Sequence, residues 1–209
     1  ILKNQYVPIL EQFIILVFLR DSNKDLYIQY IVKNLSQMKL HDKMLIPIGC
    51  MQHAAGLLVT KSKRGFFQLT IYNTGLGVNV WHPQFPNSDR FQTFLEIDDV
   101  PELSLTKEDI WLFLIKHQMH GANMNAIYEK LISLGNLLDP SSHEAYFEAK
   151  QHEGTCAMQF LMAFEREQFM KIAPGTAEEK EAAYKILKAN QFHRYRMDHA
   201  KEVDPNIQE

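Results

Sequence analysis

The sequence has no hydrophobic run long enough to cross a membrane. Its longest apolar run, residues 13–19, is far shorter than the roughly 20 residues that a spanning helix needs. We therefore expect no integral membrane segment. No secretory signal is recognisable, but the sequence starts at Ile1 without a methionine, and we expect it to be a piece of a longer chain.

Cysteine is also scarce, and there is no surplus of basic charge. The 209 residues include two cysteines, Cys50 and Cys156, which are too few for a disulfide framework and favour a reducing, cytoplasmic compartment. The net charge of −3 lacks the basic surplus of a general nucleic-acid binder. We therefore expect no nucleic-acid partner, and each cysteine has to be considered as a reactive thiol.

The composition is that of an ordinary globular protein, with 46% hydrophobic residues and neither repeats nor low-complexity tracts. Apolar spacing predicts helices, then strands, then helices, which is the order of an α+β fold with a central antiparallel sheet flanked by helices. The predicted helices cover residues 1–20, 24–38, 105–120, 125–134, 142–150, 156–170 and 176–199. The predicted strands cover residues 44–49, 53–60, 66–73, 78–81 and 91–97, and Pro47 restricts the first of them to an edge or entry segment.

The centre of the predicted sheet is a β-hairpin formed by residues 53–60 and 66–73. The polar segment 61–65, which ends in a glycine, is predicted to be its loop. If Thr60 pairs with Phe66, His53 lies opposite Asn73 on the same face of the sheet, at a Cβ–Cβ distance of roughly 5 Å. A histidine held beside a carboxamide is half of a catalytic apparatus.

Cys156 and Gln151 are candidates for the other half. Cys156 follows Gly154 and Thr155 at the predicted start of an apolar helix, where unpaired N–H groups and the helix dipole stabilise a thiolate. Gln151, five residues earlier, could form an oxyanion hole with the backbone N–H of Cys156. The alternative is that Cys156 is a small buried core residue and Gln151 a surface residue.

These residues, in the segments QHAAGLLV, TIYNTG and QHEGTCAMQF, resemble the cysteine peptidases typified by adenovirus protease and the SUMO and deubiquitinating proteases. Bacterial effector proteases and acetyltransferases share the order of site residues. The resemblance covers roughly residues 44–170 and implies a papain-like fold. It also implies His53 as base, Asn73 as its orienting partner, Gln151 as oxyanion donor and Cys156 as nucleophile.

The resemblance therefore implies a thiol protease that acts on ubiquitin or a ubiquitin-like protein, without cofactor or metal, and in the host cytosol if the chain is a secreted effector. Three parts are expected: an N-terminal helical segment 1–43, a catalytic core 44–173 and a C-terminal helix 174–209. Two alternatives stay open. One is an acyltransferase or deamidase with the same triad, and the other is a non-catalytic interaction domain.

Three further residues could take part in chemistry. Cys50 lies three residues before His53, and we expect its thiol to be poorly aimed at the ring. His82 could line the cleft beside Asn73 or compete as the base. His117 and His120 have a spacing that could bind a metal, although no third ligand is evident and a helix-surface pair is the simpler interpretation.

Overall fold

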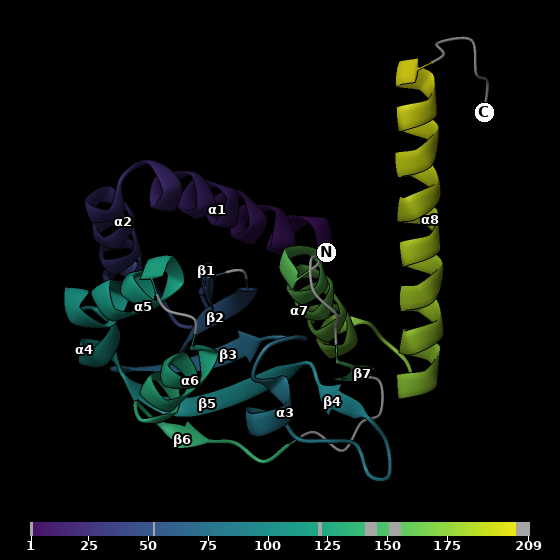
Figure 1. Cartoon of the computed structure of the whole chain (residues 1–209). Coiled ribbons are helices and arrows are strands. Elements are labelled where there is room, and N and C mark those ends of the chain that lie inside the picture. The colour runs from purple at the N-terminus through teal and green to yellow at the C-terminus, as the bar shows by residue number, and fades with distance from the viewer. Residues whose placement is uncertain (1, 52, 121–122, 141–145, 151–155, 204–209) are drawn as a thin grey trace. The chain divides into compact units, whose positions relative to one another are not determined.

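The computed structural model describes residues 2–51, 53–120, 123–140, 146–150 and 156–203, without the side chains of residues 2–6, 120, 156–158 and 192–203. The chain forms two compact units, residues 1–164 and residues 165–209. The first unit contains the whole sheet and most of the helices (Figure 1). The predicted α+β class and antiparallel sheet are confirmed.

The main sheet has five antiparallel strands in the order β1-β2-β3-β5-β6. They are β1 (Lys43–Cys50), β2 (His53–Lys63), β3 (Phe66–Tyr72), β5 (Phe94–Pro101) and β6 (Asn136–Leu137). Pro47 lies in the edge strand β1, as predicted, because a residue without an N–H is tolerated where no second neighbour needs it. Two short strands, β4 (Arg90–Gln92) and β7 (Phe147–Ala149), pair separately.

Helices cover both faces of the main sheet (Figure 1). The helices of the first unit are α1 (Leu2–Ser22), α2 (Lys24–Gln37), α3 (Val78–Trp81), α4 (Glu102–Leu105), α5 (Glu108–His120), α6 (Met124–Ile132) and the first part of α7 (Cys156–Ile172). One face packs against α2, α4, α5 and α6, and the opposite face packs against α7. Helix α1 runs beside the edge strand β1, with Leu16 in the first cluster and Ile9 in the second.

The pairing of β2 with β3 differs by two residues from the predicted register. Thr60 pairs with Gln68, and β2 extends to Lys63, so that Arg64 and Gly65 remain as the turn. Gly65 has the left-handed φ of 79° that such a tight turn needs. Lys61 lies in the strand because its Nζ is 2.7 Å from Oε2 of Glu102 and lies over a phenyl ring of β3. A shift of two keeps every side chain on its predicted face.

Two other predicted elements are wrong in type. Residues 78–81, predicted as a strand, form the short helix α3, because Gly77 at φ 87° turns the chain before the β-branched residues can extend a strand. Residues 147–149, predicted within a helix, form β7 and pair with β4. The guanidinium of Arg90 holds this pair by donating hydrogen bonds to the carbonyl oxygen of Phe147, at 3.0 Å from Nε and 2.6 Å from Nη2.

The second unit combines the last part of α7 with α8 (Ala177–Val203). A capping box starts α8: the Glu179 N–H donates to Oγ1 of Thr176 at 3.3 Å, and the Thr176 N–H donates to Oε2 of Glu179 at 2.7 Å. The predicted cap is therefore confirmed. None of the helices in the described part of the chain combines the length and apolar character that crossing a bilayer requires.

Candidate functional site

The structure brings His53 and Asn73 together at one end of the sheet. His53 is the first residue of β2, and Asn73 directly follows β3, where its backbone N–H donates to the Thr93 carbonyl at 3.1 Å. His53 Nε2 lies 2.8 Å from Asn73 Oδ1. The two residues meet as predicted, although the pairing of β2 with β3 ends at Gly56 and Tyr72, so that His53 and Asn73 lie beyond the last paired residues.

The contacts of the Asn73 carboxamide fix its orientation. Its Nδ2 donates to the Leu76 carbonyl at 2.7 Å and to the Tyr128 hydroxyl at 2.9 Å, and its Oδ1 accepts from the Gly75 N–H at 2.9 Å. A rotated amide would face the Leu76 carbonyl with its oxygen and the Gly75 N–H with its nitrogen, and both contacts would be repulsive.

This orientation settles which ring nitrogen of His53 carries the proton. An amide oxygen only accepts hydrogen bonds, so Nε2 of His53 must be the donor. In the neutral ring, Nδ1 then keeps a lone pair. Within the described residues, no protein group hydrogen-bonds to this Nδ1. His53 is therefore oriented as a general base requires, with one nitrogen anchored and the other able to take a proton.

Gly75 permits the close approach of the imidazole. A Cβ at this position would lie 2.6 Å from Cε1 and 3.3 Å from Nδ1 of His53, which is too close for any real side chain. The N–H of Gly75 also closes an Asx turn onto Oδ1 of Asn73. The NTG segment is thus a tight turn whose third residue has to be glycine for the His53–Asn73 contact to form.

Burial tunes the basicity of His53. Its side chain is half-buried, and burial lowers the pKa below the ordinary 6.5, while the hydrogen bond with Asn73 acts in the opposite direction. The net effect is a lowered pKa, because the desolvation of the imidazolium outweighs the hydrogen bond. The ring is therefore neutral at pH 7, the form in which it can accept a proton.

An open pocket of about 550 Å³ lies beside the histidine. Its walls come from the end of α1, the start of α2, the end of β1, the start of β2 and the end of α5. The residues around it are Arg20, Asp21, Ser22, Asn23, Lys24, Cys50, His53, Ala54, Gln118 and Met119. The imidazole is thus accessible from a concave surface, which a substrate chain could enter.

Cys50 lies closer to His53 than the sequence indicated. The two residues are directly paired between β1 and β2, so their side chains share one face of the sheet, and both line the pocket. Cys50 is only 3% exposed and also contributes to the hydrophobic core. The structure therefore places the side chain of Cys50 beside that of His53, on the same face of the sheet and at the same pocket.

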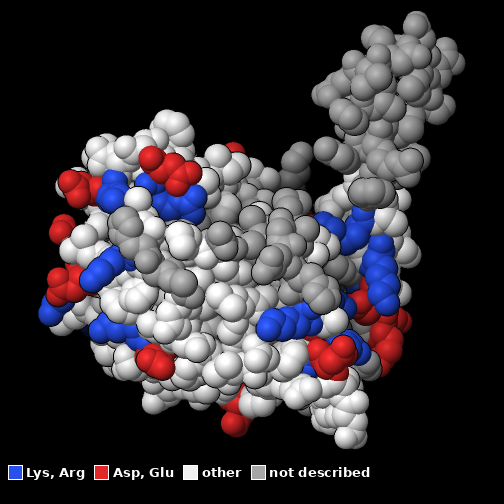
Figure 2. Space-filling model, viewed as in Figure 1, with Lys and Arg blue, Asp and Glu red and all other residues white. Residues whose placement is uncertain are grey.

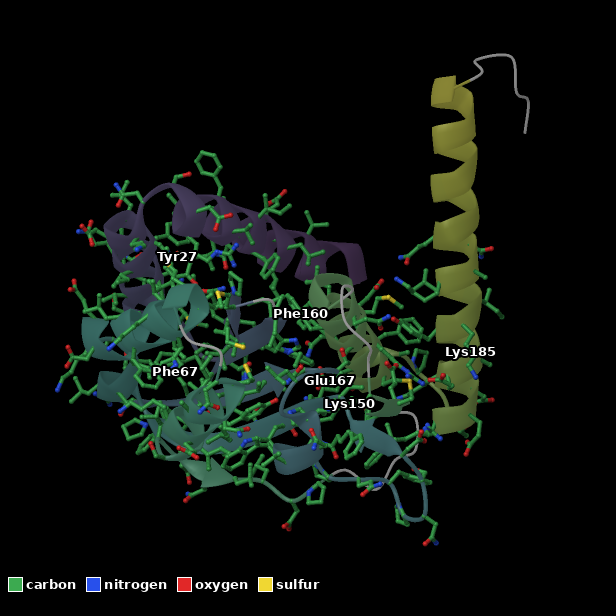
Figure 3. All side chains as sticks on the ribbon, in the orientation of Figure 1. Tyr27, Phe67, Lys150, Phe160, Glu167 and Lys185 are labelled. Atoms are coloured by element: carbon green, nitrogen blue, oxygen red, sulfur yellow. The ribbon has the colours of Figure 1, made fainter. Side chains whose placement is uncertain are left out.

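The predicted nucleophile, Cys156, is described only in its backbone, and the predicted oxyanion donor, Gln151, is not among the described residues. Cys156 is the first residue of α7, as predicted, but its side chain is outside the described residues, as is all of Gln151. Phe160 lies on α7 one turn after Cys156 (Figure 3). Its ring packs so closely against β2 that a Cβ on Gly56 would lie 2.7 Å from it. Ala54, adjacent to His53, belongs to the same cluster as Phe160.

Sequence reasoning did not identify Tyr128 or Gly75 as site residues. Gly75 could have been found, since a glycine two residues after an asparagine is typical of an Asx turn. Tyr128 had no such signal: its hydroxyl reaches Asn73 across 55 sequence positions, and only the packing of α6 on the sheet brings them together.

Comparisons with models of known protein families and with curated protein sequences found no match. Within the described residues, no group of three or more His, Cys, Asp or Glu side chains could hold a metal ion. On the face shown in Figure 2, basic and acidic side chains are interspersed among the described residues. The chemistry of the site is therefore inferred from its geometry.

Proposed function

We propose that the chain is a thiol hydrolase that cleaves a peptide or isopeptide bond, with Cys156 as nucleophile, His53 as base and Asn73 as its orienting partner. The observation that carries the proposal is the hydrogen bond of 2.8 Å between His53 Nε2 and Asn73 Oδ1. It leaves Nδ1, the nitrogen with the lone pair, to serve a thiol.

The start of α7 supports Cys156 as that thiol. The first residue of a helix of 17 residues lies at the positive end of the helix dipole, where a thiolate is stabilised. The packing of Phe160 against Gly56 ties the first turns of α7 to β2, three residues from His53. A residue one turn before Phe160 is about 6 Å from it along the helix axis.

The proposed reaction has two acyl-transfer steps. The neutral ring of His53 takes the proton of the Cys156 thiol, and the resulting thiolate attacks the carbonyl carbon and forms a C–S bond. The imidazolium of His53 then gives that proton to the amine as the C–N bond breaks. Water then attacks the thioester while His53 takes its proton, and the C–S bond breaks to release the acid and the thiolate. Gln151 and the Cys156 backbone N–H would stabilise the oxyanion in both steps.

The proposed substrate is ubiquitin or a ubiquitin-like protein, and this part rests on the resemblance of the site segments alone. It is tested with ubiquitin and SUMO that carry an electrophile at the C-terminus. We expect covalent labelling of the parent, loss of labelling in Cys156→Ala and His53→Ala, and retention in Cys50→Ser. Failure of both probes, with normal thiol reactivity, would reject the substrate class and keep the thiol site.

A separate experiment identifies the thiol. With two cysteines in the chain, Cys50→Ser and Cys156→Ser each leave one thiol, and intact mass reports its alkylation by iodoacetamide. We expect Cys156 to react at pH 6.5–7.5, well below the pH at which an ordinary thiol with pKa about 8.5 is ionised. Rapid alkylation of Cys50 alone would move the nucleophile to the pocket, and slow alkylation of both near pH 9 would reject an activated thiolate.

A further inference from the structure

His82 and Tyr128 extend the His53–Asn73 pair into the protein core. His82 follows α3 and is 5% exposed, and Tyr128 on α6 is fully buried. Nδ1 of His82 lies 2.6 Å from the Gln92 carbonyl oxygen, and its Nε2 lies 2.6 Å from the Tyr128 hydroxyl. Both ring nitrogens are therefore engaged inside the protein, and His82 is not a competing base.

The direction of each hydrogen bond in this chain is determined from its inner end. The Gln92 carbonyl can only accept, so Nδ1 of His82 carries a proton. Burial lowers the pKa of His82 to about 4, so the ring is neutral at pH 7 and its Nε2 has a lone pair. That lone pair requires the Tyr128 hydroxyl to be the donor.

The same logic continues outward to the catalytic pair. Because the Tyr128 proton points to His82, the hydroxyl presents only lone pairs to Asn73, and it can accept from Nδ2 but cannot donate to Oδ1. The oxygen of Asn73 therefore faces His53. Without an acceptor at His82, the hydroxyl could turn and donate to Asn73, and it would no longer distinguish the two ends of the carboxamide.

We propose that His82 is a positioning residue that acts through Tyr128 to hold the Asn73 carboxamide, and through it the ring of His53. The inference rests on the proposed function for the role of His53 as the base, but the hydrogen-bond chain itself can be tested without substrate. It runs from the Gln92 carbonyl through His82, Tyr128 and Asn73 to His53.

The test follows the ring N–H protons of His53 and His82 by ¹H–¹⁵N NMR at pH 7.5. Tyr128→Phe removes the hydroxyl and keeps the ring, which stacks on Trp81 with centroids 5.7 Å apart. His82→Asn keeps a donor for the Gln92 carbonyl and loses the distal acceptor. His82→Gln can supply an acceptor to Tyr128 and serves as the conservative variant.

We expect the His53 Nε2–H signal to persist in the parent and in His82→Gln. In Tyr128→Phe and His82→Asn this proton should exchange with water at least about tenfold faster, because the buried hydrogen bond that holds Asn73 to Tyr128 is lost or weakened. The double variant Tyr128→Phe/His82→Asn should match Tyr128→Phe alone, since the two residues act in series. The His82 Nδ1–H signal, which depends on Gln92, should survive in Tyr128→Phe and report an intact fold.

Parent-like exchange at His53 in Tyr128→Phe would overturn the inference, and that variant decides it alone if His82→Asn does not fold. Parent-like exchange in a folded His82→Asn would show that His82 does not contribute to the hydrogen-bond chain. Failure of the proposed function is a separate result, because it appears as an unreactive Cys156 in the parent while the NMR signals are unaffected.

Discussion

Acid should destabilise the folded protein through His82, and the size of the effect follows from its burial. The pKa of His82 is lowered from 6.5 to about 4, because the buried ring is costly to charge. In the unfolded chain the ring takes up a proton near pH 6.5, whereas the folded protein takes it up only near pH 4. The stabilising contribution is therefore complete above pH 6.5 and is lost as the pH falls toward 4.

The magnitude comes from the two pKa values. At about 1.4 kcal/mol per tenfold change, the separation between 6.5 and about 4 corresponds to a total of about 3.5 kcal/mol. About 2 kcal/mol of this should already be lost at pH 5, where the unfolded ring is almost fully charged and the folded ring is still mostly neutral. A loss of this size is a large part of the stability of an ordinary domain.

Urea unfolding of the parent and His82→Gln at pH 7.5 and pH 5.0 measures this contribution. His53, whose pKa is also lowered, contributes with the same sign in both proteins, so the difference between their pH effects isolates His82. We expect the parent to lose about 2 kcal/mol more than the variant between the two pH values. Equal losses within about 0.5 kcal/mol, the usual additivity error, would refute the neutral buried state of His82.

Four further outcomes follow from the site. Gly75→Ala should displace the His53 ring and slow thiol alkylation by up to about 100-fold, as misplacement by 1 Å can, whereas Leu76→Ala, which keeps its carbonyl, should not. Asn73→Asp should destabilise the protein by about 3 kcal/mol or more in urea unfolding, since it buries a carboxylate with one oxygen against the Leu76 carbonyl. Gly56→Ala should cost about 1–3 kcal/mol in thermal unfolding, through the clash with the aromatic ring of α7. As the pH is lowered, kcat/KM should fall to half of its maximum only below pH 6.5, because the lowered pKa of His53 keeps the base neutral to a lower pH. A midpoint above pH 6.5 would contradict this.

The face of each residue in the hairpin could be predicted more reliably than its exact partner. Strand alternation has a period of two, so the prediction that His53 and Asn73 share a face survives a register error of two residues. The loop was misjudged because charged residues suggested a turn. Lys61 is nevertheless in the strand, where Glu102 compensates its charge from 41 positions away.

Apart from the Asx turn at Gly75, the contacts that sequence reasoning missed depend on long-range packing. Strand β7 exists because residues 90–92 offer it a partner, although its local sequence is compatible with a helix. Tyr128 reaches Asn73, and His82 reaches Tyr128, only after α6 has packed on the sheet. Neither connection has a local signature, because the spacing between these residues reflects the fold and not a repeating pattern.

The contacts around position 73 favour an asparagine over an aspartate. Asn73 is completely buried and has to donate to Leu76 and Tyr128 on one side while accepting from His53 on the other. A carboxylate accepts at both ends and would face the Leu76 carbonyl with a lone pair. It would also require a charge beside two buried residues, Tyr128 and His82, that have no charge to offer at neutral pH. The amide stabilises an imidazolium less than a carboxylate would, but it is the group whose two ends match the partners that surround it.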